Sequence, residues 1–202
     1  MTGTEITKAT EADVQAAADR VADAFFDIDV CQWLVPDPER RRQILPPYFR
    51  ILADYAFQYG EIFFFGEQRD GAALWVYHGT EPLPDPENYE ERLRDACQEW
   101  TERFQVLDEQ FDLHHPHSPA HHHLALLATT PSQQSKGIGA KLMRQHHEWL
   151  DANGVAGYLE ASSMRSRALY EKHGYVFSGK TIDLPDGPHM WPMWREPVGA
   201  QG

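Results

Sequence analysis

The residues whose types and spacing best suit chemistry form a short loop late in the chain. An apolar, strand-like run over residues 124–129 breaks at Pro131, and the polar stretch that follows contains Gln134, Gly137 and Gly139. An amphipathic pattern typical of a helix begins directly after it. A strand, a glycine-containing loop and a helix N-terminus, in this order, present several backbone N–H groups to an anion. The loop therefore predicts a site for a phosphate-bearing cofactor.

Two common nucleotide-binding loops do not match this stretch. A Walker loop has the pattern G-x-x-x-x-G-K-[ST], but in this stretch Lys136 precedes Gly137, and residues 124–142 contain no Gly-Lys pair. Leu142 stands where a dinucleotide fingerprint needs its third glycine. The pattern that remains is Q-x-x-G-x-G. It resembles the acetyl-coenzyme A loop of the GNAT superfamily of N-acetyltransferases, whose signature is [QR]-x-x-G-x-[GA].

The chain after this loop strengthens the resemblance. A helix predicted over residues 138–150 ends at Asn153-Gly154, a typical C-terminal signal. The run A-L-Y-E-K-H-G-Y over residues 168–175 is similar to the closing motif of the family, and Tyr170 falls on its usual tyrosine. The resemblance covers residues 124–178 well and the first half of the chain only by the order of its elements.

The resemblance implies acetyl-coenzyme A as the co-substrate. Backbone N–H groups of the loop would hold its pyrophosphate, with Lys136 adding positive charge. Main-chain groups of the preceding strand would hold the thioester and the pantetheine arm, and a β-bulge there would free them from the neighbouring strand. Arg165 stands where family members often carry Asn, and we expect it to contact a cofactor phosphate instead. The cofactor-binding residues expected are Leu127, Ala128, Thr129, Gln134, Ser135, Lys136, Gly137, Ile138, Gly139, Ala140 and Arg165.

Four residues are candidates for proton transfer. By resemblance, Tyr170 is the general acid, because a phenol with an ordinary pKa of about 10 stays protonated at neutral pH and can protonate the departing thiolate. The general base is left open between Glu160, on the strand facing the cofactor strand, and His121 and His123, where the cofactor strand begins. A histidine with a pKa of about 6.5 suits proton removal near neutral pH.

Six histidines lie between residues 114 and 123 and raise the question of a metal ion. Their spacing matches no structural zinc pattern, and no cysteine lies close to them in the sequence. We therefore predict no metal site and interpret this stretch as a solvated loop that leads into a strand.

The order of predicted elements indicates an α/β fold of GNAT type, a mixed central sheet of about six or seven strands flanked by helices, in one domain. We divide the chain into an N-terminal half, an acceptor-side insert, an acetyl-coenzyme A-binding core and C-terminal strands, over residues 1–78, 79–123, 124–178 and 179–202. Pro46-Pro47 should kink the second helix or split it into two segments. One helix is expected from Asp85-Pro86 to about Val106, an irregular stretch from there to His123, and a strand over residues 175–183.

Composition and charge limit the classes of molecule that we expect this protein to bind. The net charge of −13 disfavours nucleic acid and anionic membrane surfaces and favours a cationic substrate such as an amine. No apolar run approaches the ~20 residues that span a bilayer, and no signal segment opens the sequence. Cys31 and Cys97 lie far apart in the sequence. We expect both to be free thiols, as is usual in a reducing cytoplasm.

The sequence thus predicts a cytoplasmic acetyltransferase that acts on the amine of a small molecule by direct transfer. The ending W-P-M-W-R-E-P, over residues 191–197, resembles a subgroup that includes puromycin-type acetyltransferases, so an antibiotic or another secondary metabolite is one acceptor class. A catalytically silent acyl-coenzyme A sensor and a protein N-terminal or lysine acetyltransferase are the alternatives. A homodimer is left open.

Overall fold

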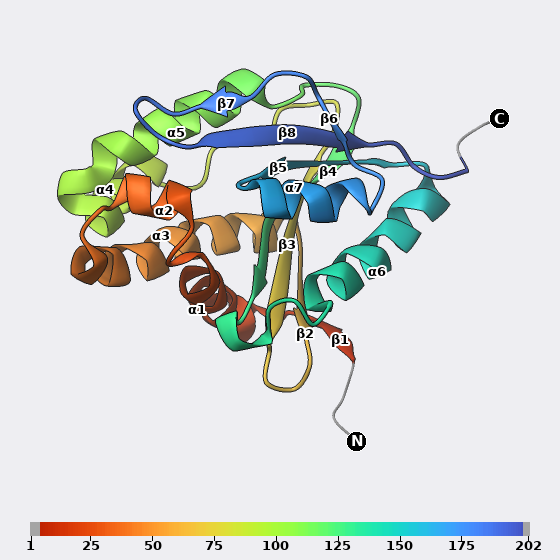
Figure 1. Ribbon diagram of the computed structural model, residues 1–202, viewed down its shortest axis with the longest axis horizontal. Coiled ribbons are helices and arrows are strands. Elements are labelled where there is room, and N and C mark those ends of the chain that lie inside the picture. Colours follow the sequence, from red (N-terminus) through yellow and green to blue (C-terminus); the bar gives the residue numbers. More distant parts are fainter. Residues whose placement is uncertain (1–4, 200–202) are drawn as a thin grey trace.

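The computed structural model describes residues 5–199, which form an eight-stranded sheet between two layers of helices (Figure 1). The strands are β1 (Ile6–Lys8), β2 (Gly60–Phe65), β3 (Gly71–His78), β4 (His121–Thr129), β5 (Ala156–Ala161), β6 (Val176–Phe177), β7 (Ile182–Asp183) and β8 (His189–Arg195). Their order is β1-β2-β3-β4-β5-β8-β6, and β7 pairs with β8 beside this path. Only β4 and β5 run parallel, so the sheet is mixed, as predicted, with one strand more than expected.

The helices divide between the two faces of the sheet. They are α1 (Val14–Phe25), α2 (Asp29–Leu34), α3 (Pro38–Tyr59), α4 (Tyr89–Cys97), α5 (Thr101–His114), α6 (Ile138–Asn153) and α7 (Met164–Glu171). Helices α1–α5 enclose the larger core on one face, and α6 and α7 enclose a second core on the other (Figure 1). Side chains alternate between these cores along each strand because a strand has a period of two residues.

The N-terminal half differs from the prediction in two places. A short helix, α2, separates α1 from α3 and was not predicted. The split of the second helix at Pro46-Pro47 is wrong, because α3 runs for 22 residues through both prolines. The prolines remove two N–H donors, but the helix buries apolar side chains on both sides of them, among them Leu45 and Tyr48. This burial offsets the lost hydrogen bonds.

The acceptor-side insert is more helical than predicted. The expected single helix begins later, at Tyr89, and is interrupted at Gln98, whose φ of 50° is left-handed. The expected irregular stretch is wrong over its first part, since α5 continues to His114. Phe104 and Leu107 are buried in the larger core and stabilise α5 against the sheet.

The C-terminal strand predicted over residues 175–183 is two short strands, β6 and β7. Gly179 lies between them with a φ of +91°, a left-handed conformation that ends the extended chain. Both short strands pair with β8 and therefore form this edge of the sheet.

The sheet opens between β4 and β5. These strands pair only at their start, where His121–His123 lie beside Ala156–Tyr158. The partner of Leu74 is Leu126 and that of Trp75 is Leu124, so Ala125 is an extra residue that forms a β-bulge in β4. Within residues 5–199, no pairing joins the rest of β4 to β5. Figure 1 shows the two halves of the sheet fanned apart, with β3 running down the drawing and β8 crossing above it.

Candidate active site

The predicted cofactor loop lies between the end of β4 and the start of α6. Gly137 is the residue before the helix and has a φ of +81°, and a side chain at its position would meet no atom within 4 Å. It offers no capping side chain, and the first N–H groups of a helix have no partner inside the helix. The N–H groups of Ile138, Gly139 and Ala140 are thus presented at an open surface with the positive end of the helix dipole behind them.

Gly139 brings this helix close to the cofactor strand. A Cβ atom at Gly139 would lie 3.3 Å from Cδ2 of Leu127, so a larger residue there would need the Leu127 side chain to shift by a few tenths of an ångström. Ala128 is buried and Thr129 ends the strand opposite Gly71. The bulge at Ala125 comes two residues before Leu127, so the expected main-chain contacts of Leu127, Ala128 and Thr129 lie on the open part of β4.

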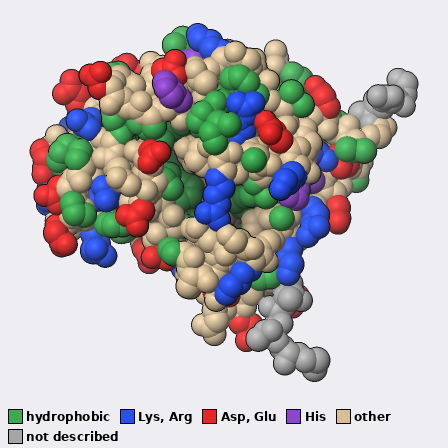
Figure 2. All heavy atoms as spheres, in the orientation of Figure 1, with side chains coloured by type: hydrophobic (Ala, Val, Ile, Leu, Met, Phe, Trp, Pro, Cys, Tyr) green, Lys and Arg blue, Asp and Glu red, His purple; other side chains and the backbone are tan. Residues whose placement is uncertain are grey.

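Two cationic side chains flank the loop. A guanidinium nitrogen of Arg165 on α7 donates to Oγ of Ser135 at 2.6 Å, which ties α7 to the loop. Nζ of Lys136 donates to Oε1 of Gln133 at 2.9 Å, and Nε2 of Gln134 lies 3.4 Å from the carbonyl oxygen of Thr129. Figure 2 shows Lys and Arg side chains gathered on this face toward α6 and α7, and Asp and Glu toward α4.

Two of the candidate bases meet where the sheet begins to open. Nε2 of His123 lies 2.7 Å from Oε2 of Glu160, across the gap between β4 and β5. The side chains are 17% and 7% exposed, so bulk water screens this hydrogen bond little. With Nε2–H donating to the carboxylate, the pair can take up a proton and share the resulting charge.

The carboxylate of Glu160 can accept a further hydrogen bond. Its Oε1 is buried and, among residues 5–199, has no hydrogen-bond partner; the same holds for the hydroxyl of Tyr158. Burial, with the negative charge of Glu160 added to it, raises the pKa of Tyr158 well above its ordinary value. A buried carboxylate oxygen without a partner is costly, which indicates that a substrate or a water molecule completes this site.

Tyr170, the predicted acid, lies on α7 in the core between that helix and the sheet. It is 9% exposed. Burial, assisted by the charge of Glu160, raises the pKa of Tyr170 well above its ordinary value. The phenol is therefore protonated at neutral pH and able to donate.

The structure separates His121 from the other candidate bases. Nδ1 of His121 lies 2.9 Å from the carbonyl oxygen of Pro119, and Nε2 lies 3.1 Å from Nε2 of His115. His121 is 1% exposed and stacks on His78. His78 and His115 were not among the predicted site residues. His115 belongs to the histidine-rich stretch over residues 114–123, whereas the position of His78 gave no signal, because β3 and the segment after α5 meet only in the folded chain.

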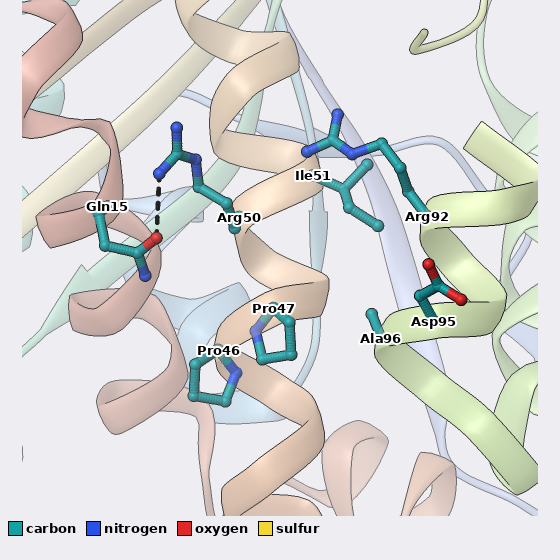
Figure 3. Close-up of a pocket in the computed structure, with 8 residues that line it drawn as sticks. All are labelled: Gln15, Pro46, Pro47, Arg50, Ile51, Arg92, Asp95 and Ala96. Atoms are coloured by element: carbon teal, nitrogen blue, oxygen red, sulfur yellow. Dashed lines mark hydrogen bonds between the residues drawn. The ribbon is translucent and has the colours of Figure 1, made fainter. Parts of the chain in front are cut away.

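The best-defined cavity is remote from this site. It has a volume of about 460 Å³ and lies between α1, α3 and α4 (Figure 3). Arg50 and Arg92 border it, and Arg50 reaches Gln15 across it. None of its lining residues belongs to the predicted site. A second cavity, of about 480 Å³, lies between α6, the turn after α7 and the end of β8.

The opened mixed sheet is the architecture of the GNAT fold, as predicted. Residues 104–177 match the family model described as acetyltransferase (GNAT) domain. The chain therefore contains a GNAT acetyltransferase domain, and members of that family use an acyl-coenzyme A co-substrate. None of the helices within residues 5–199 combines the length and apolar composition needed to cross a membrane.

Solved structures share this architecture over almost the whole chain. A Corynebacterium glutamicum protein described as histone acetyltransferase HPA2 and related acetyltransferase is 27% identical, with a TM-score of 0.71 and 100% of both chains covered. Arylalkylamine N-acetyltransferase 2 from Aedes aegypti has a TM-score of 0.59 at 15% identity and covers 95% of this chain and 98% of its own. At 15% identity, the likeness to the Aedes aegypti protein shows a shared fold alone.

Proposed function

We propose that this protein transfers the acetyl group of acetyl-coenzyme A directly to the primary amine of a small molecule, with His123 and Glu160 as the base and Tyr170 as the acid. The observation that carries this proposal is the hydrogen-bonded His123–Glu160 pair at the point where β4 and β5 separate. That opening is the place where the thioester of a cofactor held by the loop would lie.

The cofactor contacts in this proposal are the loop, the open part of β4 and Arg165. The N–H groups at the start of α6 donate hydrogen bonds to the pyrophosphate, and Arg165, already in contact with Ser135, adds a charge-assisted hydrogen bond. Main-chain groups of residues 127–129 take the pantetheine arm and the thioester oxygen, on which charge develops during attack.

In the proposed reaction the ammonium ion of the acceptor first loses one proton to solvent. The neutral amine nitrogen bonds to the thioester carbon and gives its second proton to the His123–Glu160 pair, directly or through one water molecule. The carbon–sulfur bond then breaks, the sulfur takes a proton from Tyr170, and the phenolate regains a proton from the protonated pair through solvent. Both cysteines are buried, and burial raises the pKa of each thiol to about 12, which argues against an acetyl-cysteine intermediate.

The charge of the insert supports a cationic acceptor. Residues 85–112, which form α4 and α5, contain ten acidic and three basic side chains. This helix pair ends at His114, directly before His115, whose ring is 5.0 Å from that of His123. An ammonium ion is thus attracted toward the face of the sheet that carries the base. The acceptor-side role proposed for residues 79–123 rests on this placement.

A protein lysine side chain is the second candidate acceptor. It is also a primary amine, and the 27% identical Corynebacterium protein is described as a histone acetyltransferase and related acetyltransferase. The W-P-M-W-R-E-P ending keeps puromycin-type amines within the first candidate class. Cytoplasmic location and a homodimer stay predictions.

The test is release of free thiol from acetyl-coenzyme A in the presence of an amine panel. The panel holds arylalkylamines, polyamines, puromycin, free lysine and a lysine-containing peptide. The proposal expects turnover with at least one small amine and a mass increase of one acetyl group on it. Turnover with the peptide alone would replace the first candidate by the second. Coenzyme A binding without thiol release for any amine would favour a sensor and contradict the proposal.

A further inference from the structure

A cluster of imidazole side chains lies beside the His123–Glu160 pair but is not part of that pair. His78 ends β3, His115 follows α5 and His121 opens β4, so three separate segments supply it. The metal-ligating nitrogens of these three side chains all lie within 4.8 Å of one another. Tyr158 and Trp194 pack edge-on against His121 and help to enclose the group.

We propose that His78, His115 and His121 form a binding site for one divalent transition-metal ion of the zinc class. Three imidazoles with an open fourth position are an established ligand set for Zn²⁺. The prediction of no metal site rested on spacing within residues 114–123, and the structure adds His78, from a distant part of the sequence, to His115 and His121 of that stretch.

The distances suit tetrahedral coordination. Two nitrogens that bind one Zn²⁺ at about 2.0–2.1 Å in tetrahedral geometry stand about 3.3 Å apart. Nε2 of His115 and Nε2 of His121 are 3.1 Å apart, so that edge is already formed. The ligand nitrogen of His78 lies within 4.8 Å of both of these atoms, so the His78 ring must move closer to complete the triangle.

The chemical state of the cluster also suits a metal ion. The Nδ1 atom of His121 faces the carbonyl oxygen of Pro119, so Nδ1 carries the proton and Nε2 keeps its lone pair for a ligand.

A second set shares His115 and must be distinguished. His115, His123 and Glu160 also bring their ligand atoms within 4.8 Å of one another, but two of these form the proposed base pair. An ion bound to His78, His115 and His121 would leave the His123–Glu160 pair intact. It would also link the end of the insert to β3 and β4.

The test uses the untagged full chain, stripped with chelator and titrated with Co²⁺ and with Zn²⁺ by absorption spectroscopy and calorimetry. We expect one ion per chain, a Co²⁺ spectrum typical of tetrahedral nitrogen ligation and a higher melting temperature with Zn²⁺. His115→Gln and His78→Gln should each weaken binding at least about tenfold, while the exposed His189→Gln control should leave it unchanged.

Three results would overturn the proposal. One is the absence of stoichiometric binding by the wild-type chain, a measurement that needs no variant to fold. The second is binding that survives both His78→Gln and His115→Gln but disappears in His189→Gln, which would mark a surface ion. The third is loss of binding in Glu160→Gln with retention in His78→Gln, which would assign the ion to the carboxylate set.

Discussion

Acidification should destabilise this protein through two buried histidines on α6. Burial lowers the pKa of His146 and of His147 to about 3 each, so the folded chain keeps them neutral. The unfolded chain protonates each of them near pH 6.5. Protons therefore favour the unfolded state as the pH falls from about 6.5 toward 3, and the free energy of unfolding decreases over that range.

The surroundings of the two rings explain their neutral state. His146 stacks on Trp75 with centroids 4.1 Å apart and faces the Nδ1 atom of His122 at 2.8 Å. The nearest carboxylate, on Glu61, is 3.9 Å from His146 and already bonds Lys8.

His147 bonds the hydroxyl of Tyr175 at 3.1 Å. Arg195 and His173 lower its pKa further, and Asp151, which bonds Arg195, raises it only partly. Neither ring therefore has a carboxylate partner of its own.

The size of the effect follows from these pKa values. Between pH 7 and pH 5.5, each histidine costs about 1.3 kcal/mol of stability, so the pair costs about 2.5 kcal/mol. Asp108 opposes this, because burial raises its pKa to about 6 and the folded chain takes up its proton first. Over the same interval Asp108 contributes about 0.8 kcal/mol of stabilisation.

The assay is urea unfolding at several pH values for the wild type and for His146→Gln and His147→Gln. Subtracting the pH dependence of each variant's free energy of unfolding from that of the wild type removes the contributions of Asp108 and of the remaining histidines. Each variant should lose about 1.3 kcal/mol less than the wild type between pH 7 and pH 5.5, whatever its stability at pH 7. Identical pH dependence in all three proteins would refute the reasoning.

Three further changes test the cofactor loop and the acid. Gly137→Ala and its control Gly154→Ala, both left-handed glycines in open space, should each cost about 1–2 kcal/mol of stability, but only Gly137→Ala should weaken coenzyme A binding in calorimetry. Arg165→Met should raise the Kd for coenzyme A about fivefold, the equivalent of one hydrogen bond of about 1 kcal/mol, and an unchanged Kd would remove Arg165 from the site. Tyr170→Phe should lower kcat about 10²-fold or more with little change in KM for acetyl-coenzyme A, whereas Tyr175→Phe, in the same core, should keep kcat; equal losses would show a packing effect.

The parts of the fold that the sequence predicts well are those with local signals. Gly154 and the Ser163 cap end and begin helices where their residue types indicate, and the glycines at 137 and 139 mark the loop before α6. The insert was predicted poorly because α5 depends on burial of Phe104 and Leu107 against distant residues, which no local pattern reveals.

The candidate site also has one part that a local motif predicts and one part that depends on the folded sheet. The loop is contiguous, so a short motif identifies it. The His123–Glu160 contact depends on the register between β4 and β5 and on the bulge at Ala125, both of which are properties of the folded sheet. The sequence therefore proposed both residues separately and left the choice among three bases open.

The most direct test of the account is kcat/KM for the preferred amine in Glu160→Gln, measured beside the affinity for coenzyme A. Glutamine keeps the size of the side chain but cannot take up a proton. We predict a loss of about 10²–10⁴-fold with unchanged coenzyme A binding. The control Glu61→Gln, a carboxylate near His146 on the other face, should retain full activity. A Glu160→Gln enzyme within about threefold of the wild type would contradict the account.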